Sequence, residues 1–375
     1  MNTEKTVGSS LFRQTSETED GQTVQLNKGH YSLDTIERLN RFTELLGQGW
    51  KEDYAEYRRL WVDLPTQKKI RDYPLLVDIE LASACNLSCP MCYTISDEFK
   101  AKVTKGLMDF DIFKKIIDEI KGKVYSVRLS FRGESTLHRH FIECIEYAKN
   151  SGIKEVATLT NGWRLKGEYL RRVVDAGIDW ITVSIDGVGE TYESIRKPIK
   201  FDEIVSNLTE LAELKKRENL TRPLVKVQGI WPAVKKDPNT YYKIFSKISD
   251  LVAFNPLIDY LRNDSDVVFE DRFSCPQLYQ RLVIGSDGKV MMCSNDEDGE
   301  EIVGDMYTQS IHEIWHGDEL NRIRKIHSEL DGFKCLGVCK KCYYPRKTEP
   351  NESVVVDGRQ VVIENYINRA QQIGR

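Results

Sequence analysis

The sequence lacks the features that would direct its chain to a membrane or to nucleic acid. No apolar run among its 375 residues approaches the about 20 residues needed to cross a bilayer. Residues 1–25 are polar and contain no apolar segment of the kind found in signal peptides. The net charge is −4 and there is no long basic run that would bind phosphates. We therefore expect a cytoplasmic protein without a membrane or nucleic-acid partner.

Histidine is scarce, whereas cysteine is clustered. The chain has six histidines and nine cysteines. Disulfides are rare in the reducing cytoplasm, so clustered thiols there indicate metal ligands or redox chemistry. Only Cys144 stands alone, at an apolar position of a helical segment, where we expect a small buried hydrophobic side chain. The other eight form two groups, namely Cys85, Cys89 and Cys92 early in the chain, and Cys275, Cys293, Cys335, Cys339 and Cys342 late in it.

Short β-rich apolar runs alternate with helical segments through the middle of the chain. This alternation predicts a parallel sheet with crossover helices, either barrel-like or doubly wound. Ligands of such sheets lie at the C-terminal ends of the strands, and the early cysteines directly follow the first strand. The expected strands are 75–81, 124–131, 155–160, 180–186, 224–230 and 251–258.

The early cysteines have the spacing C-x3-C-x2-C, in SACNLSCPMCYT (83–94). A structural zinc site needs four ligands, and no histidine lies near this segment to serve as the fourth. A thioredoxin-like pair would use only Cys89 and Cys92, and it does not fit the order of strands and helices. A [4Fe–4S] cluster normally takes four thiolates, so three leave one iron open for an outside molecule. The spacing favours iron–sulfur, with zinc and redox thiols as alternatives.

This motif, followed by Tyr93 after the first strand, resembles that of the radical S-adenosylmethionine (SAM) enzymes. The resemblance implies an α/β fold, a partial (β/α)6 TIM-like barrel, in which the open iron binds the amino and carboxylate groups of SAM. It also implies an electron donor such as flavodoxin or ferredoxin. One electron from the reduced cluster would cleave SAM to methionine and a 5′-deoxyadenosyl radical, which abstracts a substrate hydrogen.

Other segments at strand ends resemble the cofactor-binding segments of that family. SFRGESTLH (130–138) resembles its Gly-Gly-Glu segment, with Arg132 in place of the first glycine. In the family the glutamate accepts a hydrogen bond from the SAM ammonium, and the glycine permits close approach of the backbone. The segments LTNG, VSIDG, YESIRKP and VQGI extend the resemblance. The residues that it places at the cofactor are Tyr93, Gly133, Glu134, Asn161, Ser184, Arg196 and Gln228.

The late cysteines resemble the SPASM and twitch extensions of the same family, which hold auxiliary [4Fe–4S] clusters behind the substrate. A full SPASM unit carries more cysteines than the five present here, so the resemblance implies one auxiliary cluster. Zinc held by any four of the five is the alternative. The expected cluster ligands are Cys275, Cys293, Cys339 and Cys342, with Cys335 spare or in place of Cys339. The histidines of the connecting helix, which we expect at the surface, are His312, His316 and His327.

The substrate is a separate question, with two readings. In the first, the enzyme oxidises, dehydrates or epimerises a sugar, aminocyclitol or nucleotide sugar. In the second, it is a maturase that modifies a ribosomally made peptide or a protein side chain. A helical N-terminal segment and a single auxiliary cluster favour the first reading, and a non-catalytic iron–sulfur or zinc protein is the remote alternative. Residues that could contact the substrate follow the sixth strand, and they are Asp259, Arg262 and Asp264.

These observations predict four segments along the chain. Residues 1–73 form a polar tail and a helical extension, because the apolar residues of 32–71 have helical spacing. Residues 74–270 form the radical SAM barrel. Residues 271–345 form the small cysteine-rich domain, with a hairpin signal at Asp287-Gly288. Residues 346–375 are a C-terminal tail.

Overall fold

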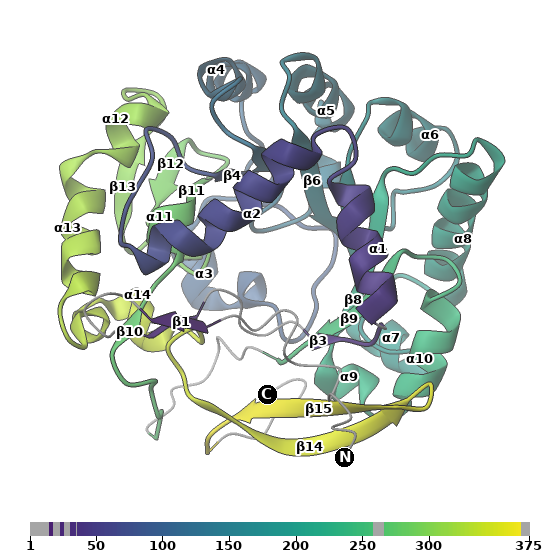
Figure 1. Ribbon diagram of the computed structural model, residues 1–375. Helices are drawn as coiled ribbons and strands as arrows, with labels where there is room; N and C mark the ends of the chain where they lie inside the picture. Colours follow the sequence, from purple (N-terminus) through teal and green to yellow (C-terminus); the bar gives the residue numbers. More distant parts are fainter. Residues whose placement is uncertain (1–14, 18–22, 26–30, 35, 258–265, 369–375) are drawn as a thin grey trace.

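The structure is a computed structural model that describes residues 15–17, 23–25, 31–34, 36–257 and 266–368, and the statements below concern these residues (Figure 1). Its main sheet has ten strands in the order β13-β12-β11-β4-β5-β6-β7-β8-β9-β3. Strands β4 to β9 are parallel to one another, which is the predicted partial barrel. The strands of this sheet are β3 (Tyr31–Ser32), β4 (Leu76–Ile79), β5 (Ser126–Arg128), β6 (Glu155–Thr160), β7 (Trp180–Ser184), β8 (Leu224–Ile230), β9 (Leu251–Asn255), β11 (Arg281–Ile284), β12 (Lys289–Met291) and β13 (Ile302–Asp305).

Amphipathic helices cover the outer face of the parallel strands (Figure 1). Helix α4 is an example: Asp109 caps its N-terminus by accepting hydrogen bonds from two backbone N–H groups, and Phe113, Ile116 and Ile120 lie buried on one face. Each such side chain contributes about 1.5–3 kcal/mol when fully buried. The helices that follow the barrel strands are α4 (Phe110–Ile120), α5 (Phe141–Asn150), α6 (Gly167–Asp175), α7 (Glu190–Ile195), α8 (Phe201–Arg217), α9 (Trp231–Val234) and α10 (Pro238–Phe245).

Strand β4 alternates core residues with a buried charge, because successive side chains point to opposite faces of a strand. Val77 and Ile79 of β4 belong to the hydrophobic core, whereas Asp78 between them is fully buried and pairs with arginines. Arg128 Nε lies 2.8 Å and Arg281 Nη1 3.2 Å from its carboxylate. Buried charges are retained only where they are paired in this way. A charged network around the buried Asp78 thus connects β4, β5 and β11.

Helices α1 (Ile36–Leu46) and α2 (Lys51–Thr66) form the helical extension that the spacing predicted. Helix α2 packs its aromatic residues against the start of the barrel. The ring centroids of Tyr57 and Tyr125 are 5.3 Å apart, and Tyr125 directly precedes β5. The extension thus covers the N-terminal ends of the strands and leaves the opposite end to the cysteine loop.

The late cysteine region continues the barrel sheet. Strand β11 is parallel to β4, with Leu282 paired to Val77, and β12 and β13 follow antiparallel to it. The hairpin expected at Asp287-Gly288 joins β11 to β12, and Gly288 has the positive φ of 79° that its turn requires. One sheet therefore runs across the border expected between the barrel and the cysteine-rich domain.

A long hairpin occupies the segment that we expected to be a C-terminal tail. Strands β14 (Thr348–Val356) and β15 (Arg359–Tyr366) pair antiparallel around the turn Asp357-Gly358, whose φ angles are both positive. Asn239 of α10 donates to the carbonyl of Val355 and accepts from the N–H of Asp357. The hairpin lies beside α9 and α10 (Figure 1, yellow).

The remaining elements belong to the N-terminal segment, to the early cysteine loop and the turn after β5, and to the late cysteine region. They are β1 (Thr15–Glu17), β2 (Thr23–Gln25), β10 (Phe273–Ser274), the short 3-10 helices η1 (Tyr93–Ile95), η2 (Ser135–Leu137) and η3 (Gly332–Cys335), and α3 (Asp97–Lys102), α11 (Gln277–Gln280), α12 (Ile311–Trp315), α13 (Asp318–Ser328) and α14 (Gly337–Lys341). Within the described part of the chain, no helix combines the length and the apolar character that a membrane span requires.

Candidate functional site

The early cysteines lie on the loop that leaves strand β4. The loop is held by local hydrogen bonds: the N–H of Leu87 donates to Cys85 Sγ over 3.4 Å, and the N–H of Cys92 donates to the carbonyl of Cys89. The hydroxyl of Thr94 lies 3.0 Å from Cys92 Sγ. Cys89 is buried, and the other two thiols are half-buried. The loop thus presents three thiols at the C-terminal end of the barrel.

These thiols are close enough to affect one another's protonation. Burial raises the pKa of Cys89 to about 11, and the neighbouring Cys85 and Cys92 add to the rise, whereas the guanidinium of Arg196 opposes it. Three thiolates together would therefore be unfavourable without a cationic centre between them. An iron cluster supplies such a centre and displaces the thiol protons when it binds, so the residues fit the cluster.

At Gly133, the turn that follows β5 comes into direct backbone contact with the start of the cysteine loop. Its φ is 62°, and a Cβ at this position would lie 2.5 Å from the carbonyl oxygens of Ala82 and Ala84. The N–H of Glu134 donates to the same Ala84 carbonyl over 2.8 Å. Only glycine meets both requirements, the positive φ and the backbone contact. The family resemblance expected close approach of the backbone at Gly133, and the two backbones are in contact there.

The carboxylate of Glu134 is buried and held in one orientation. Its Oε1 accepts from the hydroxyls of Thr136 and Thr160, both over 2.6 Å, and from the N–H of Thr136. Its Oε2 accepts from the N–H of Asn161 over 2.7 Å. A carboxylate has about four lone-pair sites divided between its two oxygens. Oε2 thus retains acceptor capacity for a further donor such as an ammonium group.

Two other predicted cofactor residues are neighbours, and a third contacts the loop. Ser184 and Gln228 are paired in register at the ends of β7 and β8, so they share the inner face of the barrel. The amide of Asn161 donates to the side chain of Asn86, within the cysteine loop, over 2.8 Å. The ring of Tyr93 packs edge-on against Phe99, and burial raises the pKa of Tyr93 well above its usual range.

Arg196 lies at the end of α7 and pairs with Asp186, a residue that sequence reasoning did not assign. Nε and Nη2 both lie 2.6 Å from Asp186 Oδ2, while Oδ1 accepts from the N–H of Ile230. The buried ion pair keeps the guanidinium charged and fixed. Its positive charge acts to lower the pKa of Cys89. Asp186 stands in the VSIDG segment, so its position after the strand was the available signal.

Arg132, the departure from the Gly-Gly-Glu pattern, forms a buried bridge. Its Nε and Nη2 contact the two carboxylate oxygens of Glu80 over 2.6 and 2.7 Å, and its Nη1 donates to the carbonyl of Glu297 over 2.9 Å. Glu80 follows β4, and Glu297 belongs to the loop after Cys293. The arginine thus connects the start of the early loop to the late cysteine region.

Four of the late cysteines are close enough to affect one another's protonation. Burial raises the pKa of Cys293 well above its usual range, and the charges of Cys275, Cys339 and Cys342 raise it further. Burial also raises the pKa of Cys275 to about 11 and that of Cys342 to about 12. The fifth, Cys335, is exposed at the end of η3. The four grouped thiols provide a complete set of ligands for a cluster, by the same charge argument as for the early loop.

The surface position expected for His327 is wrong. Its imidazole is fully buried, and Nε2 lies 3.4 Å from Cys339 Sγ. Burial lowers its pKa to about 4. The buried face of α13 also carries Leu320 and Ile323, so His327 follows them at helical spacing. His312 is exposed and His316 is half-exposed, as expected.

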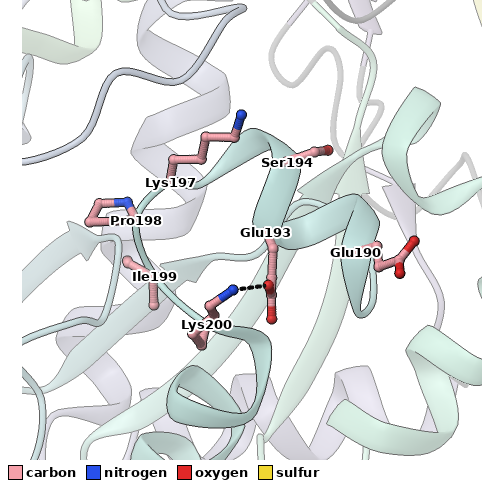
Figure 2. A pocket seen from close by; sticks show the side chains of 7 residues that line it. All are labelled: Glu190, Glu193, Ser194, Lys197, Pro198, Ile199 and Lys200. Atoms are coloured by element: carbon pink, nitrogen blue, oxygen red, sulfur yellow. Dashed lines mark hydrogen bonds and ion pairs between the residues drawn. The ribbon is translucent and has the colours of Figure 1, made fainter.

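Two other features lie outside this constellation. An open cavity of about 530 Å³ lies at the turn between α7 and α8, where the ammonium of Lys200 lies 2.7 Å from Glu193. Figure 2 shows the side chains that line it. Its lining contains none of the predicted site residues. The lining residues are Glu190, Glu193, Ser194, Lys197, Pro198, Ile199 and Lys200. The substrate candidates Asp259, Arg262 and Asp264 lie outside the described residues.

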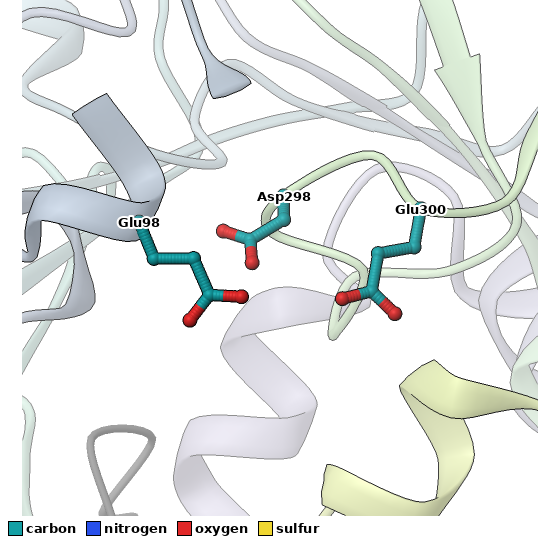
Figure 3. A group of neighbouring side chains, drawn as sticks. All are labelled: Glu98, Asp298 and Glu300. Carbon is teal, nitrogen blue, oxygen red and sulfur yellow. The ribbon is translucent and has the colours of Figure 1, made fainter. Parts of the chain in front are cut away.

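An acidic group joins the two cysteine regions at the surface. Figure 3 shows Glu98 of α3 facing Asp298 and Glu300 of the late loop, with oxygens within 4.8 Å of one another. The ammonium of Lys102 lies 3.0 Å from Glu98 and 3.4 Å from each of the other two, and Lys341 lies 2.7 Å from Glu300. Lysines thus already balance these carboxylates, which act as a salt-bridge network between the regions.

Comparison with known proteins places these two regions in known families. Residues 79–227 match the radical SAM superfamily, and residues 275–343 match the SPASM iron–sulfur cluster-binding domain. The chain therefore contains a radical SAM domain followed by a SPASM domain. The first match contains the early cysteine loop together with Gly133, Glu134 and Arg196, and the second runs from Cys275 to beyond Cys342.

Curated relatives match this radical SAM chain over part of their length. The tungsten-containing aldehyde ferredoxin oxidoreductase cofactor-modifying protein of Pyrococcus furiosus is 29% identical over 143 residues, which are 34% of this chain and 39% of that protein. The mycofactocin maturase MftC of Mycobacterium tuberculosis is 32% identical over 143 residues, which are 38% of this chain and 35% of that protein. The alignments therefore cover less than half of either relative.

Two solved structures share the fold of this chain. BtrN in complex with AdoMet and 2-DOIA has a TM-score of 0.51 at 18% identity, over 72% of this chain and 92% of BtrN. The anSMEcpe structure with bound AdoMet has a TM-score of 0.53 at 16% identity, over 71% of this chain and 88% of that one. At these identities the likeness establishes the partial barrel with its cysteine-rich extension.

Proposed function

We propose that this radical SAM enzyme binds SAM at a [4Fe–4S] cluster on Cys85, Cys89 and Cys92 and uses it to remove a hydrogen atom from a small hydroxylated substrate. The proposal rests on the backbone contact between the Gly133–Glu134 turn and the cysteine loop. The turn brings a fixed carboxylate to the open end of a three-thiol site. An acceptor with a free lone pair beside an incomplete ligand set suits a cofactor that carries an ammonium group.

The bound group would supply the radical chemistry: one electron cleaves SAM to methionine and a 5′-deoxyadenosyl radical, which takes the substrate hydrogen. The chain's own residues would bind and orient SAM. Glu134 Oε2 would accept from the ammonium group, while the Thr136 and Thr160 hydroxyls keep the carboxylate from rotating. Arg196, held by Asp186, would offer its remaining N–H donors to the SAM carboxylate. Ser184 and Gln228 would face the ribose from the inner face of the barrel.

The late thiols would hold one closed auxiliary cluster. Cys275, Cys293, Cys339 and Cys342 offer four ligands, which leaves no open iron position for a substrate. A closed cluster suits electron transfer, and the substrate would lose or regain an electron through it. An external one-electron donor such as flavodoxin or ferredoxin would reduce the early cluster.

The first substrate class is a sugar, aminocyclitol or nucleotide sugar that is oxidised, dehydrated or epimerised. Three features support it. Charged residues stand on β4, β5 and β11, where the buried Asp78 pairs with Arg128 and Arg281, and such residues suit a hydroxylated substrate. The late region offers a single set of four grouped thiols, and the fold matches that of BtrN, whose structure contains 2-DOIA.

The second substrate class is a peptide. The mycofactocin maturase is among the relatives, and a structure of anSMEcpe with AdoMet and the Cp18Cys peptide has a TM-score of 0.50. Deuterium transfer from labelled sugars, aminocyclitols and peptides into 5′-deoxyadenosine distinguishes the two classes.

The test of the central proposal is anaerobic reconstitution of the full chain, followed by reduction with SAM and measurement of 5′-deoxyadenosine. The wild type is expected to form it, and Cys85→Ala is expected to form none. The matched control is Cys144→Ala, which removes a buried thiol of α5 outside both groups. Formation of 5′-deoxyadenosine by Cys85→Ala would refute the assignment. Iron content near eight per chain supports two clusters, near four supports the early cluster alone, and near twelve contradicts a single auxiliary cluster.

A further inference from the structure

His327 is placed beside the late thiols in a way that the cysteine pattern does not explain. It lies in the last turn of α13, and Cys339 lies on α14, so the two helices bring the imidazole and the thiol together. The distance from Nε2 to Sγ is 3.4 Å, and the imidazole is fully buried. Among the described residues, Nδ1 has no hydrogen-bond partner. The ring thus directs one nitrogen at the sulfur and leaves the other in an apolar setting.

The surroundings determine which ring nitrogen carries the proton. A cluster-bound thiolate only accepts hydrogen bonds, so a nitrogen that faces it is stabilised when it donates. The opposite tautomer would point a lone pair at the sulfur and bury an unpaired N–H at Nδ1, which is the more costly arrangement. The Nε2–H tautomer is therefore favoured, and His327 is a donor to Cys339.

The position also distinguishes a donor from a ligand. Each iron of a cluster with four protein ligands takes one of them, and the grouped cysteines already provide four. A ring nitrogen 3.4 Å from the sulfur of Cys339 stands beside an existing ligand, at hydrogen-bond separation. His327 therefore adds to the ligand set rather than replacing a member of it.

We propose that His327 donates an Nε2–H hydrogen bond to the cluster-bound thiolate of Cys339 and thereby raises the reduction potential of the auxiliary cluster. This inference rests on the proposed function, in which Cys339 binds that cluster. Hydrogen bonds to cluster sulfur atoms stabilise the reduced state because it carries more negative charge, and they are one of the factors that set the potential. His327 is thus a positioning residue that acts through Cys339.

A second side chain offers a comparison at the same site. The amide of Asn295 lies 3.5 Å from Cys342 Sγ, and Asn295 is half-buried. Its hydrogen bond is longer and partly exposed to water, which can replace the amide as a donor. The loss of Asn295 should therefore shift the potential less than the loss of His327.

The experiment is an anaerobic redox titration of the full reconstituted chain, followed by electron paramagnetic resonance. A parallel series carries Cys85→Ala, Cys89→Ala and Cys92→Ala, so that only the auxiliary cluster contributes to the signal. For His327→Phe, we expect the ratio of reduced to oxidised auxiliary cluster at a fixed potential to fall about 10-fold, which is about 59 mV for a one-electron couple. His327→Gln, which keeps an N–H donor, should give a smaller shift, Asn295→Leu a smaller one still, and His316→Ala none.

Iron content separates the possible failures. If Cys339→Ser and Cys293→Ser both retain the iron content of the wild type, the auxiliary cluster of the proposed function is refuted. If the iron content is complete and His327→Phe leaves the midpoint unchanged, only the role of His327 is refuted. If His327→Phe and His327→Gln both lose the auxiliary iron, His327 is a ligand and the proposed hydrogen bond is refuted.

Discussion

The early and late cysteine regions use the same ligand in opposite settings. The early loop has three thiols, two of them half-buried, at the open end of a polar barrel. The late region groups four thiols, of which Cys275, Cys293 and Cys339 are buried. The imidazole of His327 lies 3.4 Å from Cys339 Sγ, and the amide of Asn295 donates to Cys342 Sγ. On the proposed assignment, the first arrangement leaves an iron for the cofactor, and the second closes the cluster. Ligand number and access, rather than ligand type, thus distinguish a binding site from an electron carrier.

The largest expected effect comes from removing a ligand at each site in turn. Cys85→Ala should abolish both 5′-deoxyadenosine and product. Cys293→Ser should abolish product but keep 5′-deoxyadenosine formation at the same order of magnitude as the wild type, because the early site remains intact. Chromatographic quantification of 5′-deoxyadenosine and of deuterium transfer checks both. Equal loss of 5′-deoxyadenosine in the two variants would show that the sites do not differ in this way.

The next expected effect tests the contact between the Gly133 turn and the early loop. Gly133→Ala places a Cβ 2.5 Å from two backbone carbonyl oxygens, so the loop must move, and we expect the early iron to be lost. Gly122→Ala is the matched control, because Gly122 also has a positive φ, 73°, but a Cβ there meets no atom within 4 Å. The control should cost about 1–2 kcal/mol in unfolding free energy and keep all iron. Iron analysis and thermal unfolding measure both, and full iron content in Gly133→Ala would contradict the expectation.

Much of this comparison was predictable from the sequence. The strands of the barrel read as apolar, β-rich runs between helical segments, so periodicity located them to within a few residues. The cysteine spacings identified both groups of thiols. The turn Asp357-Gly358 stands between the apolar runs SVVV and QVVI, a strong hairpin signal that the prediction of a C-terminal tail passed over.

Two contacts could not be predicted from the sequence, namely that of His327 with Cys339 and that of Arg132 with Glu80. His327 follows Leu320 and Ile323 at helical spacing, so its burial was predictable, but its proximity to Cys339 depends on how α13 packs on α14. Arg132 and Glu80 are 52 residues apart, and their buried ion pair arises only when β4 and β5 lie side by side. Local sequence patterns carry no information about such long-range pairing. The departure from Gly-Gly-Glu therefore looked like a weakness of the motif, whereas the arginine links the two regions.

A smaller effect tests the carboxylate at the early site. Glu134→Gln replaces one acceptor oxygen by an N–H2 donor, which cannot satisfy both the N–H of Asn161 and the ammonium of SAM. We expect the Kd for SAM to rise about 10- to 100-fold, which corresponds to about 1.4–2.7 kcal/mol. Equilibrium binding of SAM to the reconstituted chain measures it. The potential of the auxiliary cluster should be unchanged, and a shift there would contradict the separation of the two sites.

The smallest expected effect concerns a buried charge on β8, two residues before Gln228. Burial lowers the pKa of Lys226 from 10.5 to about 8. Between pH 8 and 10.5 the unfolded chain therefore binds more protons at this lysine than the folded chain, so this residue makes the wild type more stable as pH rises through that range. Lys226→Met removes the dependence. We expect its Tm to exceed that of the wild type by a few degrees at pH 7, with the difference vanishing above pH 10.5. Thermal unfolding of both proteins at several pH values measures the difference, and a constant difference across that range would contradict the lowered pKa of Lys226.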